Sequence, residues 1–106
     1  MLIADGGDDA AALAAAGEFI RWFRGHEPEA RRFAAAKLLD IHNHAWSEGQ
    51  PITAEAFAER MTLQSIALNT DGPVSLCYED GDLFWGHMIL VRMSEERTFE
   101  DAAVAG

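Results

Sequence analysis

Two stretches of the chain place residue types that could do chemistry close together. The first runs from Asp40 to His44 with the sequence Asp-Ile-His-Asn-His, and the second runs from Asp80 to His87 with the sequence Asp-Gly-Asp-Leu-Phe-Trp-Gly-His. Carboxylates and imidazoles ligate metals, and they are also common proton donors and acceptors in enzymes. Each stretch therefore has a chemical interpretation and a structural one.

The stretch from Asp40 to His44 falls near the end of a predicted helix. Residues two apart on a helix do not share a face, so His42 and His44 diverge, whereas Asp40 and His44 at i, i+4 share one. Asp40 and His44, with His42 as a further candidate, would offer some of the three or four ligands that a metal needs. The structural interpretation is that a histidine at a helix C-terminus complements the helix dipole. We expect no metal here and no cofactor elsewhere.

The second stretch centres on His87. Phe84 and Trp85 could surround its imidazole with the apolar environment that a catalytic base needs, and Asp82 or Asp80 could orient it. No serine, threonine or cysteine nucleophile stands at a recognisable spacing from His87. The structural interpretation is a histidine hydrogen-bonded within a sheet or at an interface. We take Asp80, Asp82, Phe84, Trp85 and His87 as candidate interaction or functional residues, and none as catalytic.

Charge and composition exclude several classes of function. The 106 residues carry 18 acidic and 8 basic side chains, a net charge of −10. Such a surface repels nucleic-acid phosphates and anionic membranes, so we expect neither as a partner. A basic protein partner is compatible with this charge, although acidity also serves solubility. Four arginines near the first helix junction could bind an anion, but we expect them to pair with nearby glutamates; the residues are Arg21, Arg24, Arg31 and Arg32 with Glu18, Glu27 and Glu29.

The remaining compositional signals predict a cytoplasmic protein. Cys77 is the only cysteine, which excludes an intrachain disulfide and a thiolate zinc cage. The segment from Met1 to Gly17 lacks the basic start and the apolar run of a signal peptide. No apolar stretch is long enough to span a membrane.

Hydrophobic periodicity divides one domain, residues 1–106, into a helical half and a strand half, with residues 1–7 expected to be flexible. A first helix begins at Asp8 or Asp9 and is stopped by Gly25. Pro28 marks the first turn of a second helix, and Thr53 is a plausible N-cap of a third. The apolar face of the second helix is expected to comprise Ala34, Leu38, Ile41 and Ala45.

From Thr62 to Met93 the apolar residues alternate with period two, which is typical of strands. Residues 69–72 form a turn signal, and Asp80-Gly81 predicts a tight type I′ hairpin with these two residues at its centre. Phe84 to Met93 follows as a strand that is apolar on both faces. We therefore predict an α+β fold, with three N-terminal helices followed by a three-stranded antiparallel β-meander.

The segment from Tyr78 to His87 resembles a bacterial family known as domain of unknown function 2262. Its members share a hydrophobic strand, an acidic glycine turn and a Leu-Phe-Trp-Gly-His stretch, and the similarity reaches back to Phe57. The resemblance implies a bacterial cytoplasmic origin and an α+β fold. It carries over no catalytic residues.

Two functional hypotheses remain. The first is a non-enzymatic protein-interaction module, in one version an immunity- or antitoxin-like protein that blocks a basic partner. The alternative is a small hydrolase or metal-dependent enzyme that uses His87 with Asp82, or His42 and His44 with Asp40. Because the strand from Phe84 to Met93 is apolar on both faces, we also expect a homodimer.

Overall fold

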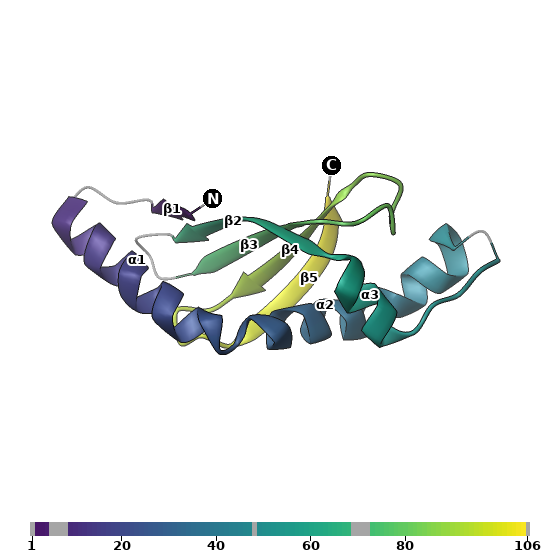
Figure 1. The fold of residues 1–106 in the computed structure, drawn as a ribbon, viewed down its shortest axis with the longest axis horizontal. Coiled ribbons are helices and arrows are strands. Elements are labelled where there is room, and N and C mark those ends of the chain that lie inside the picture. The colour runs from purple at the N-terminus through teal and green to yellow at the C-terminus, as the bar shows by residue number, and fades with distance from the viewer. Residues whose placement is uncertain (1, 5–8, 48, 69–72, 106) are drawn as a thin grey trace.

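The computed structural model describes residues 2–4, 9–47, 49–68 and 73–105, and for residues 2–4, 9–13 and 15 it describes the backbone alone. After one short strand the chain forms its helices and then an antiparallel meander, which confirms the predicted α+β class (Figure 1). In chain order the elements are β1 (Leu2–Ala4), α1 (Asp9–Arg24), α2 (Glu27–Ile41), η1 (His42–Trp46), α3 (Ala54–Arg60), β2 (Thr62–Leu68), β3 (Val74–Glu79), β4 (Met88–Met93) and β5 (Phe99–Ala105).

The helix boundaries follow the local signals in the sequence. Helix α1 ends immediately before Gly25, and Pro28 lies in the first turn of α2, where its missing N–H leaves no helical hydrogen bond unmade. Thr53 caps α3, because its side-chain oxygen accepts the backbone N–H of Ala56 at 3.1 Å. Helix α2 continues directly into a π-helical turn, η1, which ends at Trp46.

The sheet is larger than the predicted meander of three strands. Its order is β1-β2-β3-β4-β5, with β1 parallel to β2 and all other neighbours antiparallel. Strand β5 forms from the acidic tail, where Phe99 and Val104 pack on the core. Strand β1 lies within the start that was expected to be flexible. The alanine and acidic residues of β5 have low strand propensity, so its pairing with β4 decides its conformation.

The helices cover one face of this sheet. Strands β3 and β4 bury every second side chain, and helices α1 and α2 contribute mainly phenylalanine and alanine to the same core. The small alanines of α2 let it approach α3 and β5 closely. The sheet residues buried in this core are Ile66, Val74, Leu76, Tyr78, Ile89, Val91, Met93 and Ala102.

Two of the predicted elements need correction. The predicted apolar face of α2 is wrong at its end, because Ile41 and Ala45 are exposed and His42 is buried in their place. The predicted strand from Phe84 is too long, because β4 begins only at Met88. The tetrapeptide 69–72, predicted as a turn, lies outside the described residues.

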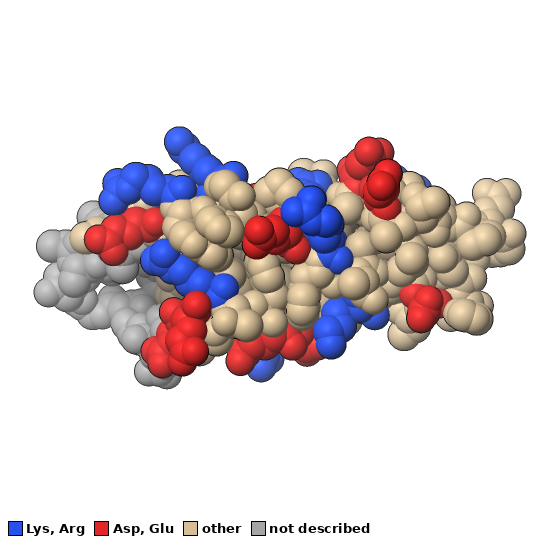
Figure 2. Space-filling model, turned by 90° about the horizontal axis from the view of Figure 1, so that it is seen from below, with Lys and Arg blue, Asp and Glu red and all other residues tan. Residues whose placement is uncertain are grey.

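Charged side chains of both signs are interspersed on the side of the molecule seen in Figure 2, and the right-hand end of that view is largely uncharged. Within the described ranges, no helix is both long enough and apolar enough to cross a membrane.

Candidate functional site

The segment from Asp80 to His87 forms an eight-residue loop between β3 and β4, which we call the Asp80 loop. Glu79 and Met88 are the last paired residues of the two strands, so the predicted two-residue connection is wrong. A tight turn does form, but one residue later than predicted. Gly81 and Asp82 have φ of 57° and 65°, and the Leu83 N–H donates to the Asp80 carbonyl at 3.1 Å. Positive φ at both central residues is the requirement of a type I′ turn.

The buried carboxylate of Asp80 explains why the loop is wider than a hairpin turn. Asp80 is only 3% exposed. Its Oδ1 accepts the backbone N–H of Asp82 at 3.0 Å. Its Oδ2 accepts three more, from Phe84 at 2.8 Å, Gly86 at 3.1 Å and His87 at 3.0 Å. The chain thus wraps around one charged acceptor, which satisfies four N–H groups that have no sheet partner.

Helix α3 holds the outer side of the loop. The Arg60 guanidinium donates twice to the Gly81 carbonyl, at 2.9 Å from Nε and 2.5 Å from Nη2. A Cβ atom at Gly81 would lie 2.3 Å from the Arg60 carbonyl oxygen. Only glycine therefore allows this close approach of the two backbones.

Aromatic packing holds the inner side. Phe84 is fully buried and meets the rings of His42, Phe57 and Trp46 edge-on, at centroid distances of 5.7, 6.0 and 5.4 Å. Such tilted contacts add to the stabilisation from burial. The two stretches singled out by their chemistry therefore meet in space, but they meet through ring packing.

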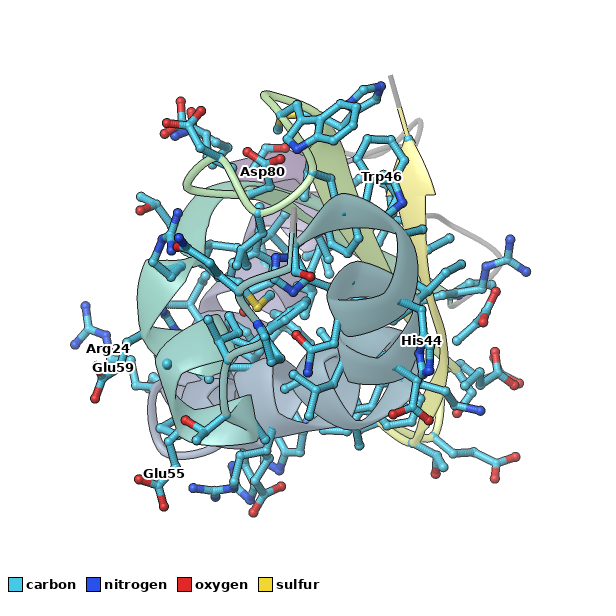
Figure 3. All side chains as sticks on the ribbon, turned by 90° about the vertical axis from the view of Figure 1, so that its right-hand side faces the viewer. Arg24, His44, Trp46, Glu55, Glu59 and Asp80 are labelled. Atoms are coloured by element: carbon cyan, nitrogen blue, oxygen red, sulfur yellow. The ribbon has the colours of Figure 1, made fainter. Side chains whose placement is uncertain are left out.

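Beyond Phe84 the loop turns outward and presents an aromatic surface. Trp85 is 59% exposed and has φ of 59°, a left-handed conformation that is rare for a bulky residue. Its ring lies 4.7 Å from Trp46 at 61°, and Trp46 lies 5.4 Å from His87 at 73°. We call Trp46, Trp85 and His87 the aromatic patch. Trp46 and Asp80 both lie in the upper part of the view in Figure 3.

The structure does not place a carboxylate on the imidazole of His87. Its Nδ1 contacts the Phe84 carbonyl oxygen, and Asp80 accepts its backbone N–H. Asp82 is exposed, and no hydrogen bond or ion pair joins its side chain to His87 within the described loop. The His-carboxylate pairing of the enzyme hypothesis is therefore not formed in this structure.

The two histidines of the stretch from Asp40 to His44 make local polar contacts in η1, just after the end of α2. The buried His42 contacts the Asn43 side chain through Nδ1 at 2.9 Å, and His44 contacts the backbone carbonyl of Asp40 at 2.8 Å. Asn43 in turn bonds both backbone groups of Ile52, which fixes the connection to α3. Across the described parts of the chain, no three His, Cys, Asp or Glu residues are grouped so that they could hold a metal ion.

A partly buried polar network joins α2, α3 and β3, and the sequence predicted only one of its contacts. Glu27 pairs with Arg31 at 2.7 Å across one turn of α2, and this is one of the pairings expected between the arginines and glutamates of this region. Glu27 also accepts the Tyr78 hydroxyl at 2.7 Å, and Arg31 donates to the carbonyls of Ala58 at 3.1 Å and Met61 at 2.5 Å. Burial, followed by the hydrogen bond to Glu27, raises the pKa of Tyr78 above its usual range. No local signal could have predicted the long-range contacts.

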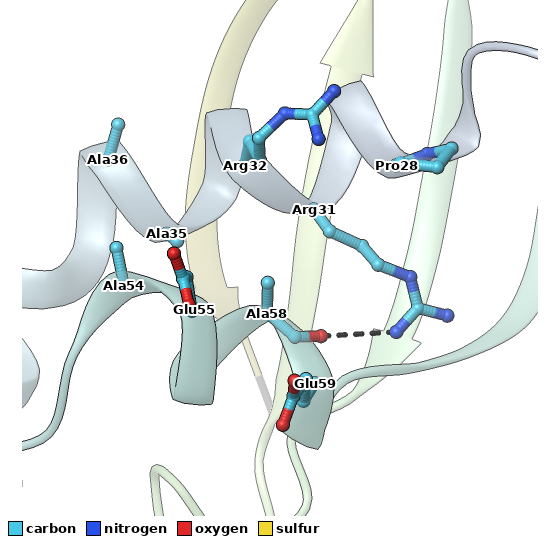
Figure 4. A pocket seen from close by; sticks show the side chains of 9 residues that line it. All are labelled: Pro28, Arg31, Arg32, Ala35, Ala36, Ala54, Glu55, Ala58 and Glu59. Carbon is cyan, nitrogen blue, oxygen red and sulfur yellow. Dashed lines mark hydrogen bonds between the residues drawn. The ribbon is translucent and has the colours of Figure 1, made fainter.

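A groove of about 580 Å³ lies between α2 and α3 beside this network (Figure 4). Alanines from both helices form much of its lining, and Arg32, Glu55 and Glu59 stand at its margins. The mixed charges give it no single-sign electrostatic character.

Comparison with known proteins places this α+β chain in a family. The family model described as "Uncharacterized protein conserved in bacteria (DUF2262)" matches residues 1–104, so the chain belongs to this bacterial family. The match includes the helical half as well as the Asp80 loop, and it is therefore wider than the resemblance that begins at Phe57. Neither the curated proteins nor the solved structures contain a significant match.

Proposed function

We propose that this protein is a protein-interaction module that binds a basic partner through the aromatic patch. The observation that carries the proposal is the exposure of Trp85 in a left-handed conformation. Such a backbone state costs about 1–3 kcal/mol in a non-glycine residue. Tryptophan is also the residue type most enriched among the side chains that dominate binding energy at interfaces.

Rigidity of the loop supports the same conclusion. Asp80 and Arg60 both form hydrogen bonds with the loop backbone, and Trp46 packs against the Trp85 ring. A side chain that is already ordered loses little conformational entropy on association. The loop therefore presents Trp85 in a form that is prepared for contact.

Charge indicates the kind of partner. The chain carries a net charge of −10, and exposed Glu79 and Asp82 lie beside and within the loop. An arginine or lysine side chain placed over a tryptophan face gains about 0.5–2 kcal/mol, and nearby carboxylates add to the attraction. An immunity- or antitoxin-like inhibitor of a basic protein, acting in the bacterial cytoplasm, is the concrete form of this proposal.

The test compares three immobilised proteins in a bacterial lysate: the natural chain, Trp85→Gly and Ile41→Ala. Glycine removes the ring while tolerating the φ of 59°, so the loop keeps its conformation. Ile41, which is 52% exposed on α2, is a matched control for the loss of an exposed apolar side chain. We expect a basic protein that the natural chain and Ile41→Ala retain and Trp85→Gly does not.

Titrations with the purified partner then measure how much Trp85 contributes to the affinity. A central tryptophan contributes about 2 kcal/mol or more, so Trp85→Gly should raise Kd at least about 30-fold, and added salt should weaken binding. Equal retention by all three proteins, or a partner that is acidic, would contradict the proposal.

A further inference from the structure

The helices cover one face of the sheet, and the opposite face of β3, β4 and β5 is open. Side chains on this open face alternate with the buried ones, and the strand register aligns them in rows across the sheet. Two such rows are Cys77–Leu90–Ala103 and Ser75–Arg92–Asp101. Most side chains in these two rows are small, apart from Leu90 and the two charged residues, and a third row on the same face is Glu79–Met88–Ala105.

An exposed leucine, Leu90, borders a hollow on this face. Leu90 is 40% exposed, one of three large apolar side chains that are exposed in the described part of the chain. Next to it lies a hollow of about 110 Å³, lined by Ser75, Leu90, Val91, Arg92, Asp101 and Ala103. A protruding side chain and an adjacent hollow on one surface satisfy each other when two copies meet about a two-fold axis.

The charges on this face are also self-complementary. Arg92 and Asp101 are opposite each other in the register and both are exposed, but no ion pair joins them. The ion pair between Arg31 and Glu27 is the one found among the described residues. A two-fold axis through the face would place each Arg92 against the Asp101 of the second copy, forming two intermolecular pairs.

We propose that a second copy of this chain packs on the open sheet face, with Leu90 of each copy in the hollow of the other. The occupant is a second copy because protrusion, hollow and opposite charges all lie on one surface, as an isologous interface requires. Burial of Leu90 supplies the apolar contact, and the two charge pairs set the register. This surface is separate from the aromatic patch, so the dimer and the proposed function can fail independently.

The first test is the mass of the purified chain by light scattering and sedimentation, at concentrations up to about 1 mM. The monomer mass is 11.6 kDa, and we expect twice this value. Leu90→Asp should return the mass to that of the monomer, because it places a carboxylate in the interface. Ile41→Asp changes another exposed large apolar residue, at the end of α2, and should remain dimeric.

The second test separates contacts between copies from contacts within one chain. Arg92→Asp alone and Asp101→Arg alone each place like charges across the two-fold axis, so each variant should be monomeric. An equal mixture of the two restores both pairs between copies, so it should form a mixed dimer. Contacts within one chain cannot produce this result.

Three results would overturn the inference. They are a natural chain that stays monomeric throughout, a dimer that Leu90→Asp leaves intact, and a mixture of charge variants that associates no more than its components. Circular dichroism of each variant checks folding, which these exposed substitutions should not change.

Discussion

Replacement of Asp80 tests how the loop is built, because one carboxylate accepts four backbone N–H groups. Asp80→Ala removes all four bonds. The Phe84 N–H is buried and would be left without a partner, at a cost of about 1–3 kcal/mol. The other three lie nearer the surface, where water can replace part of the interaction, and each should cost about 0.5–1.5 kcal/mol.

Together these losses amount to about 2.5–7.5 kcal/mol, a large part of the 5–15 kcal/mol that typically stabilises a domain. Asp80→Asn should be milder. Its amide oxygen can take the position of Oδ2 and keep three donors, while its NH₂ group faces the Asp82 N–H. Loss of one bond and of the negative charge should cost about 1–2 kcal/mol.

The assay is urea unfolding followed by far-UV circular dichroism and tryptophan fluorescence. The matched control is Asp82→Asn, the same chemical change two residues away, at an exposed carboxylate that accepts no hydrogen bond among the described residues. The control should lie within about 0.5 kcal/mol of the natural chain. If Asp80→Ala and Asp80→Asn unfold at the same urea concentration as Asp82→Asn, the carboxylate does not organise the loop and the reasoning fails.

Two further predictions concern Gly81 in the loop and Tyr78 in the core. Gly81→Ala should lower the stability of the fold by about 2 kcal/mol or more, because its Cβ would lie 2.3 Å from the Arg60 carbonyl oxygen. Gly49→Ala is the control, and it should cost only about 1 kcal/mol, because Gly49 has φ of 83° but open space around it. Thermal unfolding of both variants measures the two losses of stability, and equal losses would contradict the prediction. Because burial and Glu27 raise the pKa of Tyr78, the folded chain keeps a proton that the unfolded chain releases. Urea unfolding at several pH values should therefore show stability falling as pH rises above about 10, and Tyr78→Phe should remove this fall. A fall of the same size in Tyr78→Phe would show that other groups cause it.

The helical half could be predicted from the sequence because its signals are local. Gly25, Pro28 and Thr53 mark boundaries through effects confined to one turn of backbone. The end of α2 could not be predicted in the same way. There a polar residue, His42, takes the core position expected of Ile41. Its imidazole can be buried because Nδ1 contacts the Asn43 side chain and the rings of Phe57 and Phe84 pack against it.

The candidate site could be predicted as a location but not as an arrangement. The glycine and aspartate composition of residues 80–87 indicated a turn, and the aromatic residues indicated contact with a core or a partner. The roles of Asp80 and Phe84 could be seen only in the folded structure, because both are buried and each role depends on the groups that surround the side chain. Only the three-dimensional packing distinguishes the buried Phe84 from the exposed Trp85 next to it.

The amino-acid sequence by itself determined the α+β class, the placement of the antiparallel strands after the helices, the net negative charge and the position of the loop. These properties depend on composition, on hydrophobic period and on residues within one turn of each other. The tertiary structure alone decided that the acidic tail completes the sheet, that Asp80 is an internal acceptor, and that one sheet face stays open. Each of these depends on contacts between segments far apart in the chain, and the free energy of such contacts cannot be read from neighbouring residues.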